Sequence, residues 1–536
     1  MWGTTLAATV LGCSFELWWF SRTCFNEIDY DGIGYIGIAR HIRQGEFYAA
    51  VNALRSPMMS WLIAAGSFVD GNYLQVGKLV NMGSFVLCVA LVYALTASLW
   101  RSRVAAAVAA LLLTLGRALA ASAVESITPD FLFAALAAVY FLLLLRALRN
   151  DRVRDWFFAG TVHGFAFLCK AFALPWLAVC TVTAVILCGR PWKPRVIRLA
   201  AAALVPALMA AGWATVLHAK YGVFTTGSQF RLNILQWTLR ATDEHPDPTY
   251  LVLIDTTQDY GEYGVLDMPR SSWMWTYPIE LRQAFPKIIR AEMRNVPQAV
   301  KEMIIVETPG AMFAFVFALA VLGRRRHESP AEWRFAAVAA VAVVSLVTAY
   351  AMLVVDSRYL YPLMPLVLAV AAGFLGGAGK PGFGVWRRIC VFLVVVGVVF
   401  SLTYRSSSFR TLTRDFQSSC RDAGNRLHAH NAARFVSLGA GPFPEHGVGW
   451  EAGFKAGYFG ASRIIGTTNT LPDSSQLSAL PGDVEKASPD AILVWGRPEN
   501  PRRASLLQTL MAAYPHSSVE TILDPALGEV GLAIFR

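Results

Sequence analysis

The feature that most constrains this chain is a succession of apolar segments, each close to the length that crosses a bilayer. A membrane-spanning helix needs roughly 20 predominantly apolar residues. The chain of 536 residues is 55% hydrophobic and only 15% charged, whereas soluble domains carry about one quarter charged residues. About eleven spans are predicted, at residues 4–21, 76–99, 103–121, 128–147, 155–169, 171–189, 197–218, 310–323, 333–355, 359–378 and 386–404. The sequence therefore predicts an α-helical multi-pass membrane protein.

The basic residues of the chain lie mainly in short loops between these spans, and they predict an orientation. Cytoplasmic loops of membrane proteins are enriched in lysine and arginine. If the N-terminus is cytoplasmic, every basic loop is cytoplasmic: Arg101 and Arg103; Arg146, Arg149, Arg152 and Arg154; Arg190, Lys193, Arg195 and Arg198; Arg324, Arg325 and Arg326; and Lys380, Arg387 and Arg388. This pattern predicts a protein of a plasma membrane of the bacterial inner-membrane type. It also accounts for the net charge of +11, so we expect membrane lipid and no nucleic acid as a partner.

Three longer regions then lie outside the cytoplasm, at residues 22–75, 219–309 and 405–536. In the first, "GIGYIGIARHIR" gathers its isoleucines on one side and its basic residues on the other, which is typical of a helix lying on the membrane surface. In the third, strand-like and helix-like runs alternate, which predicts a small extracytoplasmic α/β domain. We therefore expect a membrane domain over residues 1–404 and an α/β domain over residues 405–536.

Acids and cations gather at the predicted outer ends of the spans. Asp29 and Asp31 follow the first span, and Glu125 and Asp130 flank the start of another. Ionisable groups at that depth are costly and usually functional. Helix capping is the alternative, because Asp31 precedes a short helix and "TPD" is typical of a helix start. Lys170 and Arg358 are cations at the same outer face, where they act either as interfacial anchors or as phosphate ligands.

The stretch "DYDGIGYIGIARHIRQGEFYAAVNALRSPMMSWLIA" resembles the first outer loop of the GT-C superfamily. These are glycosyltransferases that use polyprenyl-phosphate-linked sugars, and they include the protein O-mannosyltransferases and the aminoarabinose transferase acting on lipid A. "PDFLF" and "RYLYPLMPL" also look like segments of the family. The counterparts of the first-loop pattern are Asp31, Tyr35, Ile38-Ala39-Arg40, Gly45, Ser56-Pro57 and Trp61. Gly32 stands where many members have glutamate, so both Asp29 and Asp31 stay open as the functional acid.

The resemblance implies an inverting glycosyltransferase with a GT-C-like membrane domain. It implies that Asp31, or else Asp29, acts as general base on an acceptor hydroxyl or amine, and that the lipid phosphate leaves. It implies positive charge where that phosphate departs. The residues expected to bind it are Arg358, Lys170, Arg40, Arg43 and Tyr359, and Glu125 and Asp130 are expected to orient the base or the acceptor.

The expected partners are a polyprenyl-phosphate sugar donor and a glycan, lipid or protein acceptor. The sequence has no His or Cys cluster of the kind that binds zinc. The carboxylates could hold Mg²⁺ or Mn²⁺, but the basic residues present could replace a metal, so we favour a metal-independent reaction. The alternative function is a lipid or sugar transporter or flippase without transfer chemistry. That alternative predicts charged or broken segments at mid-membrane in both halves of a repeat, and the sequence has no such repeat.

Overall fold

The computed structural model describes most of the chain as two compact units. The described residues are 2–24, 28–189, 191–239, 252–253, 275, 279, 281–307, 309–324, 326–353, 356–376, 384–404, 408–439, 448–467, 480–495, 501–515, 518–524 and 528–534. The first unit, the membrane unit, comprises residues 1–25, 51–241 and 273–405. The second, the α/β unit, comprises residues 26–50, 242–272 and 406–536. Parts of the predicted outer region 219–309, at 240–251 and 254–274, lie outside the described residues.

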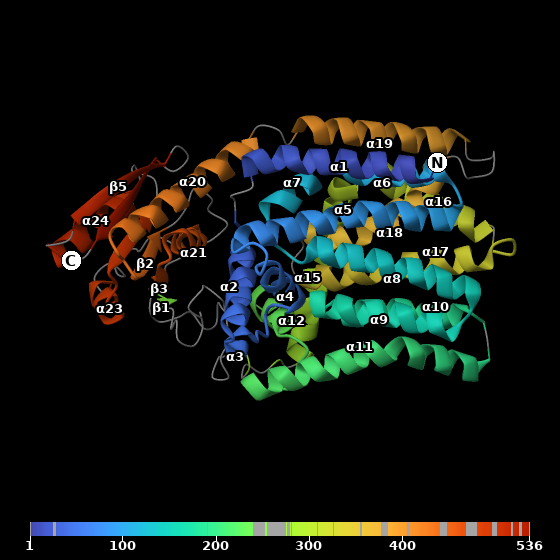
Figure 1. Ribbon diagram of the computed structural model, residues 1–536, viewed down its shortest axis with the longest axis horizontal. Coiled ribbons are helices and arrows are strands. Elements are labelled where there is room, and N and C mark those ends of the chain that lie inside the picture. The colour runs from blue at the N-terminus through green and yellow to red at the C-terminus, as the bar shows by residue number, and fades with distance from the viewer. Residues whose placement is uncertain are drawn as a thin grey trace. The chain divides into compact units, whose positions relative to one another are not determined.

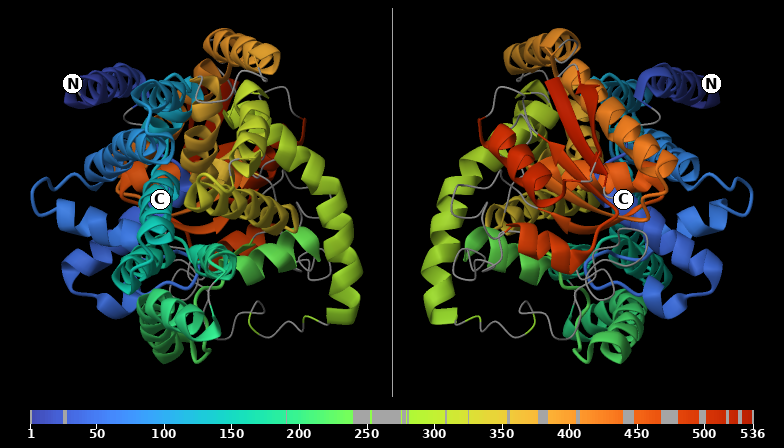
Figure 2. Two further views of the ribbon diagram at one scale, coloured as in Figure 1. Left: turned by 90° about the vertical axis from the view of Figure 1, so that its right-hand side faces the viewer. Right: turned by 90° about the vertical axis from the view of Figure 1, so that its left-hand side faces the viewer.

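The membrane unit is a bundle of helices, most of which run alongside one another (Figure 1). Helix α15, by contrast, runs across the direction of the bundle when the bundle is viewed end-on (Figure 2). The helices are α1 Trp2–Cys24, α4 Met58–Gly66, α5 Tyr73–Trp100, α6 Arg103–Thr114, α7 Arg117–Glu125, α8 Asp130–Asn150, α9 Val153–Cys169, α10 Ala173–Leu187, α11 Trp192–Tyr221, α12 Gln229–Asn233, η1 Ile234–Thr238, α15 Leu281–Glu307, α16 Pro309–Arg324, α17 Pro330–Ala351, η2 Ser357–Leu363, α18 Met364–Leu375 and α19 Gly384–Tyr404.

The length and composition of these helices make the chain a multi-pass membrane protein. Among the described residues, five helical segments are long and apolar enough to cross a membrane, or six if the bent pair α6–α7 counts as one span. The five are Tyr73–Trp100, Asp130–Asn150, Trp192–Tyr221, Pro330–Ala351 and Ser357–Leu375. Each predicted span falls largely on helical residues, but the number of eleven spans stays a prediction.

Helix α8 lies at the centre of the membrane unit, and its apolar composition explains why. Phe133, Tyr140 and Phe141 are fully buried on α8 and pack with Trp176 of α10 and Phe335 of α17 in one core cluster. A helix that is hydrophobic on nearly every side either spans a membrane or is covered by other helices, and the composition and burial of α8 fit both. The first residue of this central helix is Asp130.

The predicted span 103–121 is not one straight helix. The structure has α6 and α7, bent by 52° relative to each other. Between them, Gly116 adopts φ −69° and ψ 72°, which is not helical. A Cβ atom at Gly116 would lie 2.8 Å from Leu119 Cδ1, so a larger residue would require the Leu119 side chain to shift. As a result α7 begins a new direction and ends at Glu125.

The α/β unit contains a six-stranded sheet with the strand order β1-β3-β2-β4-β6-β5. Strands β3, β2 and β4 are parallel, whereas β1, β6 and β5 pair antiparallel with their neighbours. After residue 430 strands and helices alternate, as the sequence predicts. The elements are α2 Tyr30–Gln44, α3 Phe47–Ala50, β1 Val252–Leu253, α20 Ser408–Ala429, β2 Arg434–Gly439, α21 Val448–Gly460, β3 Arg463–Thr467, α23 Leu480–Ala487, β4 Ala491–Trp495, α24 Pro501–Ala513, β5 Ser518–Asp524 and β6 Gly528–Ile534.

Helix α2 carries the predicted acids Asp29 and Asp31 and belongs to the α/β unit, where α21 contacts it. The sequence placed these residues in the outer loop 22–75 of the membrane domain, but residues 26–50 group with the C-terminal elements. Asp29 is the N-cap of α2, with φ −91° and ψ 162°, and Gly45 ends the helix at φ 79°. That left-handed φ suits glycine, which lacks a Cβ.

Candidate active site

A buried ion pair joins the start of α8 to the turn between α9 and α10 in the membrane unit. Lys170 Nζ donates to Asp130 Oδ1 at 2.5 Å. The Asp130 side chain is 3% exposed and the Lys170 side chain 19% exposed. Asp130 lies in the first turn of α8, where the helix dipole favours a carboxylate. The sequence predicted both residues as site residues, and the structure brings them together.

Two tyrosine rings complete this cluster, from α17 and η2. Lys170 Nζ lies 4.7 Å from the ring centroid of Tyr359 and 5.9 Å from that of Tyr350. The two rings stack on each other at 4.7 Å with an interplanar angle of 10°. A cation over an aromatic face is attracted by the ring quadrupole. We call Asp130, Lys170, Tyr350 and Tyr359 the cation cluster.

The neighbours of Lys170 keep its ammonium group charged. Burial alone lowers the pKa of Lys170, but the Asp130 carboxylate beside it, with the two tyrosines, raises that pKa above its ordinary value. The cation cluster therefore holds a protonated lysine where the start of α8, the ends of α9 and α17, and η2 meet. A partly buried positive charge that is held in place in advance is suited to an anion that binds there.

Arg358, the second predicted cation, lies next to the cluster in η2. Its Nε is 2.9 Å from Asp356 Oδ2, and its guanidinium lies 5.4 Å from the ring centroid of Tyr359. Asp356 also caps η2, because its Oδ1 accepts from the Arg358 backbone N–H at 3.1 Å. The side chain of Arg358 is 31% exposed, so it remains accessible from solvent.

Contacts between the elements fix the position of the cluster. The Cys169 thiol donates to the Pro129 carbonyl at 3.5 Å, which links the residues just before Lys170 and Asp130. Ser56, one of the counterparts of the first-loop pattern, accepts from the Ala171 backbone N–H through its Oγ at 3.1 Å.

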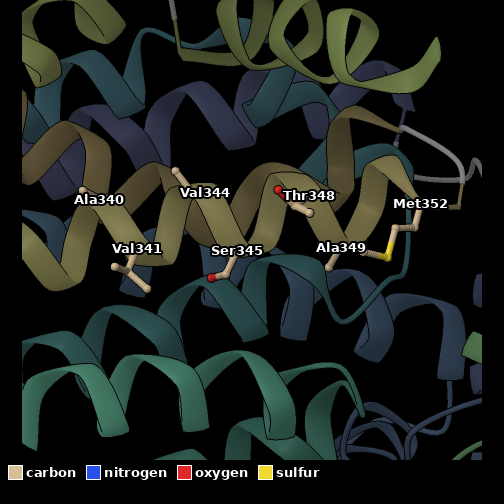
Figure 3. Close-up of a pocket in the computed structure, with 7 residues that line it drawn as sticks. All are labelled: Ala340, Val341, Val344, Ser345, Thr348, Ala349 and Met352. Atoms are coloured by element: carbon tan, nitrogen blue, oxygen red, sulfur yellow. The ribbon is translucent and has the colours of Figure 1, made fainter. Parts of the chain in front are cut away.

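An apolar groove of about 510 Å³ runs along one face of α17. Figure 3 shows its lining side chains spaced along the helix up to Met352, two residues beyond Tyr350. The lining residues are Ala340, Val341, Val344, Ser345, Thr348, Ala349 and Met352. The groove is thus a mostly apolar surface along the predicted span 333–355, and its last lining residue is Met352.

The remaining predicted site residues are placed elsewhere. Glu125, half-buried, is the last residue of α7, five residues before Asp130. Asp29 and Asp31 are half-buried in the α/β unit, so the structure does not assign them to the cation cluster. Arg40 lies over the ring of Tyr458 in α21, at 5.3 Å, and Arg43 is exposed on α2. The phosphate-binding roles of Arg40 and Arg43 stay predictions.

The described residues contain no group of three or more His, Cys, Asp or Glu side chains that could hold a metal ion. Asp130, one of the four carboxylates considered from the sequence, already has an ammonium partner at 2.5 Å. Metal-independent transfer therefore stays a prediction.

Sequence reasoning missed Tyr350 and two polar residues of α5, Lys78 and Asn81. Tyr350 lies near the outer end of a predicted span, where tyrosine is common, so its position alone gave no signal. Lys78 falls inside the predicted span 76–99, and a lysine inside a span is itself a signal of function.

Comparison with known proteins identifies the class that this fold represents. Residues 54–214 match the dolichyl-phosphate-mannose-protein mannosyltransferase family. The whole chain shares its fold with ArnT from Cupriavidus metallidurans, in the structure bound to undecaprenyl phosphate, with a TM-score of 0.53 at 12% identity over 99% of this chain and 98% of that one. The apo structure of that protein gives a TM-score of 0.54 at 12% identity, over 99% and 97% of the two chains. The resemblance to the GT-C glycosyltransferases is therefore confirmed.

Two curated relatives are similar in sequence to part of this chain. The undecaprenyl phosphate-α-4-amino-4-deoxy-L-arabinose arabinosyl transferase of Pseudomonas paraeruginosa is 30% identical to this chain over 164 residues. The corresponding protein of Pseudomonas aeruginosa matches with the same identity over the same length. In each case the match covers 30% of this chain and 30% of the relative. The matched part thus spans less than a third of these relatives.

Proposed function

We propose that this chain is an inverting glycosyltransferase that moves a sugar from a polyprenyl-phosphate donor to an acceptor at the extracytoplasmic face of the membrane. The observation that carries this proposal is the cation cluster, in which the partly buried Lys170 pairs with Asp130 and lies beside the rings of Tyr350 and Tyr359. The GT-C fold and the similarity to arabinosyl and mannosyl transferases support it.

The reaction requires one base and one stabilised leaving group. Asp31, or else Asp29, takes the proton from the acceptor hydroxyl or amine. The freed oxygen or nitrogen attacks the anomeric carbon from the face opposite the phosphate, and the bond between that carbon and the phosphate oxygen breaks. Its electron pair leaves with the polyprenyl phosphate, so the anomeric configuration inverts. Glu125 is proposed to orient the acceptor or the base.

The cation cluster is proposed to receive the phosphate of the donor. Asp130 keeps Lys170 protonated before the donor arrives, so the positive charge is in place as negative charge develops on the phosphate. Arg358 adds a second positive charge beside Tyr359, and its planar fork matches phosphate oxygens. The groove along α17 is proposed to accept part of the isoprenoid chain, because its lining is mostly apolar and lies on the helix that carries Tyr350.

The proposal is tested by incubating the purified protein in lipid vesicles with a panel of radiolabelled polyprenyl-phosphate sugars and a membrane-glycolipid extract, a polysaccharide or a protein mixture. We expect at least one donor to lose its sugar to an acceptor. Movement of intact donor between leaflets, with no transfer of sugar, would favour the flippase alternative instead.

The proposed orientation predicts which cysteines can be labelled from outside. In a cysteine-free background, cysteines at Met293 of α15 and Met511 of α24, both exposed side chains, are expected to react with an impermeant maleimide in intact cells. A cysteine at the exposed Glu328, between α16 and α17, is the control and is expected to react only after lysis. Protection of position 293 or 511 in intact cells would contradict the orientation.

The reaction is proposed to proceed without a metal ion, because Lys170 and Arg358 supply the positive charge. We expect the transfer rate to stay within about twofold after dialysis against a chelator that binds both Mg²⁺ and Mn²⁺, since cationic side chains can take the place of a metal at a developing oxyanion. Loss of activity that added Mn²⁺ or Mg²⁺ restores would show instead that the carboxylates hold a metal.

A further inference from the structure

A fully buried lysine on α5 lies beneath the turn that carries Glu125 and leads to Asp130. Lys78 is 0% exposed, and its Nζ donates to the backbone carbonyls of Val124 and Glu125, each at 2.5 Å. Asn81, one helical turn further along α5, donates through Nδ2 to the carbonyls of Ala123 and Ser126, each at 3.0 Å. Two side chains of one helix thus bind four carbonyls of one short segment.

These bonds satisfy the C-terminus of α7 completely. The last four carbonyls of an α-helix have no partner within the helix. On α7 the carbonyl of Ser122 accepts from Ser126, through its backbone N–H at 3.1 Å and its Oγ at 2.7 Å. Lys78 and Asn81 bind the other three, and the ammonium charge also suits the negative end of the helix dipole. A buried ammonium group is tolerable only when polar partners surround it in this way.

The same part of α5 also packs against Ile127, which follows the C-terminus of α7. A Cβ atom added to Gly77 would lie 3.0 Å from Ile127 Cδ1 and 3.1 Å from its Cγ2, so Ile127 packs directly on the backbone of α5. Ile127 is 0% exposed and Thr128 3% exposed. Helix α5 therefore contacts the turn between Glu125 and Asp130 through hydrogen bonds at its start and through packing on Ile127. The turn is joined to the α9 end by the bond from Cys169 to Pro129.

We propose that Lys78 and Asn81 are positioning residues of the candidate active site, which hold the α7–α8 turn so that Asp130 meets Lys170 and Glu125 faces the acceptor. The catalytic consequence rests on the proposed function, but the alignment of the Asp130–Lys170 pair does not. Lys78 touches no reacting atom in this account. It acts through the turn, whose displacement would separate the ion pair.

The test combines sugar transfer with the chemical reactivity of Lys170. The variants are Lys78→Met, which removes the donors, Lys78→Arg, which keeps charge and donors, and Asn81→Leu, a milder change that serves if Lys78→Met does not fold. Tyr140→Phe is the matched control. Tyr140 lies on α8, the helix of Asp130, and the change removes the buried hydrogen bond that its hydroxyl donates to the Leu177 carbonyl of α10. Lys170 is treated with a small amine-reactive acylating reagent at pH 9, and the extent of its acylation is quantified by peptide mass spectrometry. Lys220, which donates to the Val51 carbonyl at 2.6 Å, is the internal reference.

We expect Lys78→Met to lower kcat/KM for the donor by about 10²-fold, the loss typical of a catalytic group displaced by about 1 Å. Acylation of Lys170 relative to Lys220 should rise by about tenfold for each unit by which its pKa falls when Asp130 moves away. Asn81→Leu should change both quantities in the same direction by less, Lys78→Arg should restore most of both, and Tyr140→Phe should leave both unchanged. A purely structural role would raise the acylation of both lysines together.

The outcomes separate this inference from the proposed function. If wild type transfers no sugar but Lys78→Met still raises the acylation of Lys170 selectively, the transferase proposal fails and the positioning of the ion pair stands. If a folded Lys78→Met or Asn81→Leu protein keeps wild-type acylation of Lys170, the positioning role is overturned whether or not transfer is observed.

Discussion

Replacing Lys170 with methionine is expected to reduce kcat/KM for the polyprenyl-phosphate donor by about 10²–10³-fold, the effect of removing a preorganised group that stabilises developing charge. The same change should destabilise the protein by about 3–5 kcal/mol, because it leaves the buried Asp130 carboxylate without its partner. Both effects are measurable, the first as initial rates over a range of donor concentrations and the second as chemical unfolding in detergent micelles.

The double variant Lys170→Met with Asp130→Asn separates these two effects. It removes both charges, so most of the lost stability should return, whereas transfer should not. Lys220→Met is the control, since Lys220 is another lysine that donates to a backbone carbonyl, outside the cation cluster. If Lys170→Met kept wild-type kcat/KM for the donor, the cation cluster would not be the phosphate site.

The raised pKa of Lys170 also sets an expected pH dependence. A group whose folded pKa lies above its unfolded value contributes stability that is fully present below the unfolded pKa, here 10.5, and is lost as the pH rises through the folded value. The stability difference between wild type and Lys170→Met should therefore be constant between pH 7 and 9. A difference that disappears within this range would show that Lys170 loses its proton there, against the raised pKa.

Replacing Asp31 with asparagine is expected to reduce kcat by about 10²–10⁴-fold, the usual contribution of a general base. Asparagine keeps the shape of the side chain but does not take up a proton at neutral pH. Asp31 is half-buried and lies in the first turn of α2, so we expect the variant to fold. The measurement is transfer under saturating donor, with the fold checked by thermal unfolding.

Asp29→Asn and Asp70→Asn complete this experiment. Asp29 is the N-cap of α2 and the alternative base, and we expect its replacement to reduce kcat far less than that of Asp31. Asp70 is an acid of the same predicted outer region that accepts from the Asn72 backbone N–H, and its replacement should leave kcat unchanged. If Asp29→Asn alone abolished transfer, Asp29 would be the base; if neither variant lost activity, the base assignment would be wrong.

Local composition was enough to predict much of this fold. The apolar segments have the length of spans, and each one falls largely on helical residues. In the C-terminal region, strands such as β4 are short apolar runs bounded by turn residues, and all were recognised. Helix α20 was missed because most of it is polar, although Cys420, Ala423 and Leu427 recur at helical spacing and are buried.

The sequence predicted which residues belong to the candidate site from their type and their position at the ends of the spans. It did not predict which of these residues contact one another. Asp130 and Lys170 are 40 residues apart, and their contact depends on how α8 and α9 pack, which no local pattern encodes. The bend between α6 and α7 was also unpredicted, because the composition of residues 103–121 reads as one continuous span.

The central claim is that this chain breaks the bond between a sugar and a polyprenyl phosphate and gives the sugar to an acceptor. The most direct measurement follows both products of one reaction, with the donor labelled on the sugar and on the lipid. We predict that free polyprenyl phosphate and glycosylated acceptor form in equal amounts, with the anomeric configuration inverted. Glycosylated acceptor without released polyprenyl phosphate, or with the configuration retained, would contradict the account.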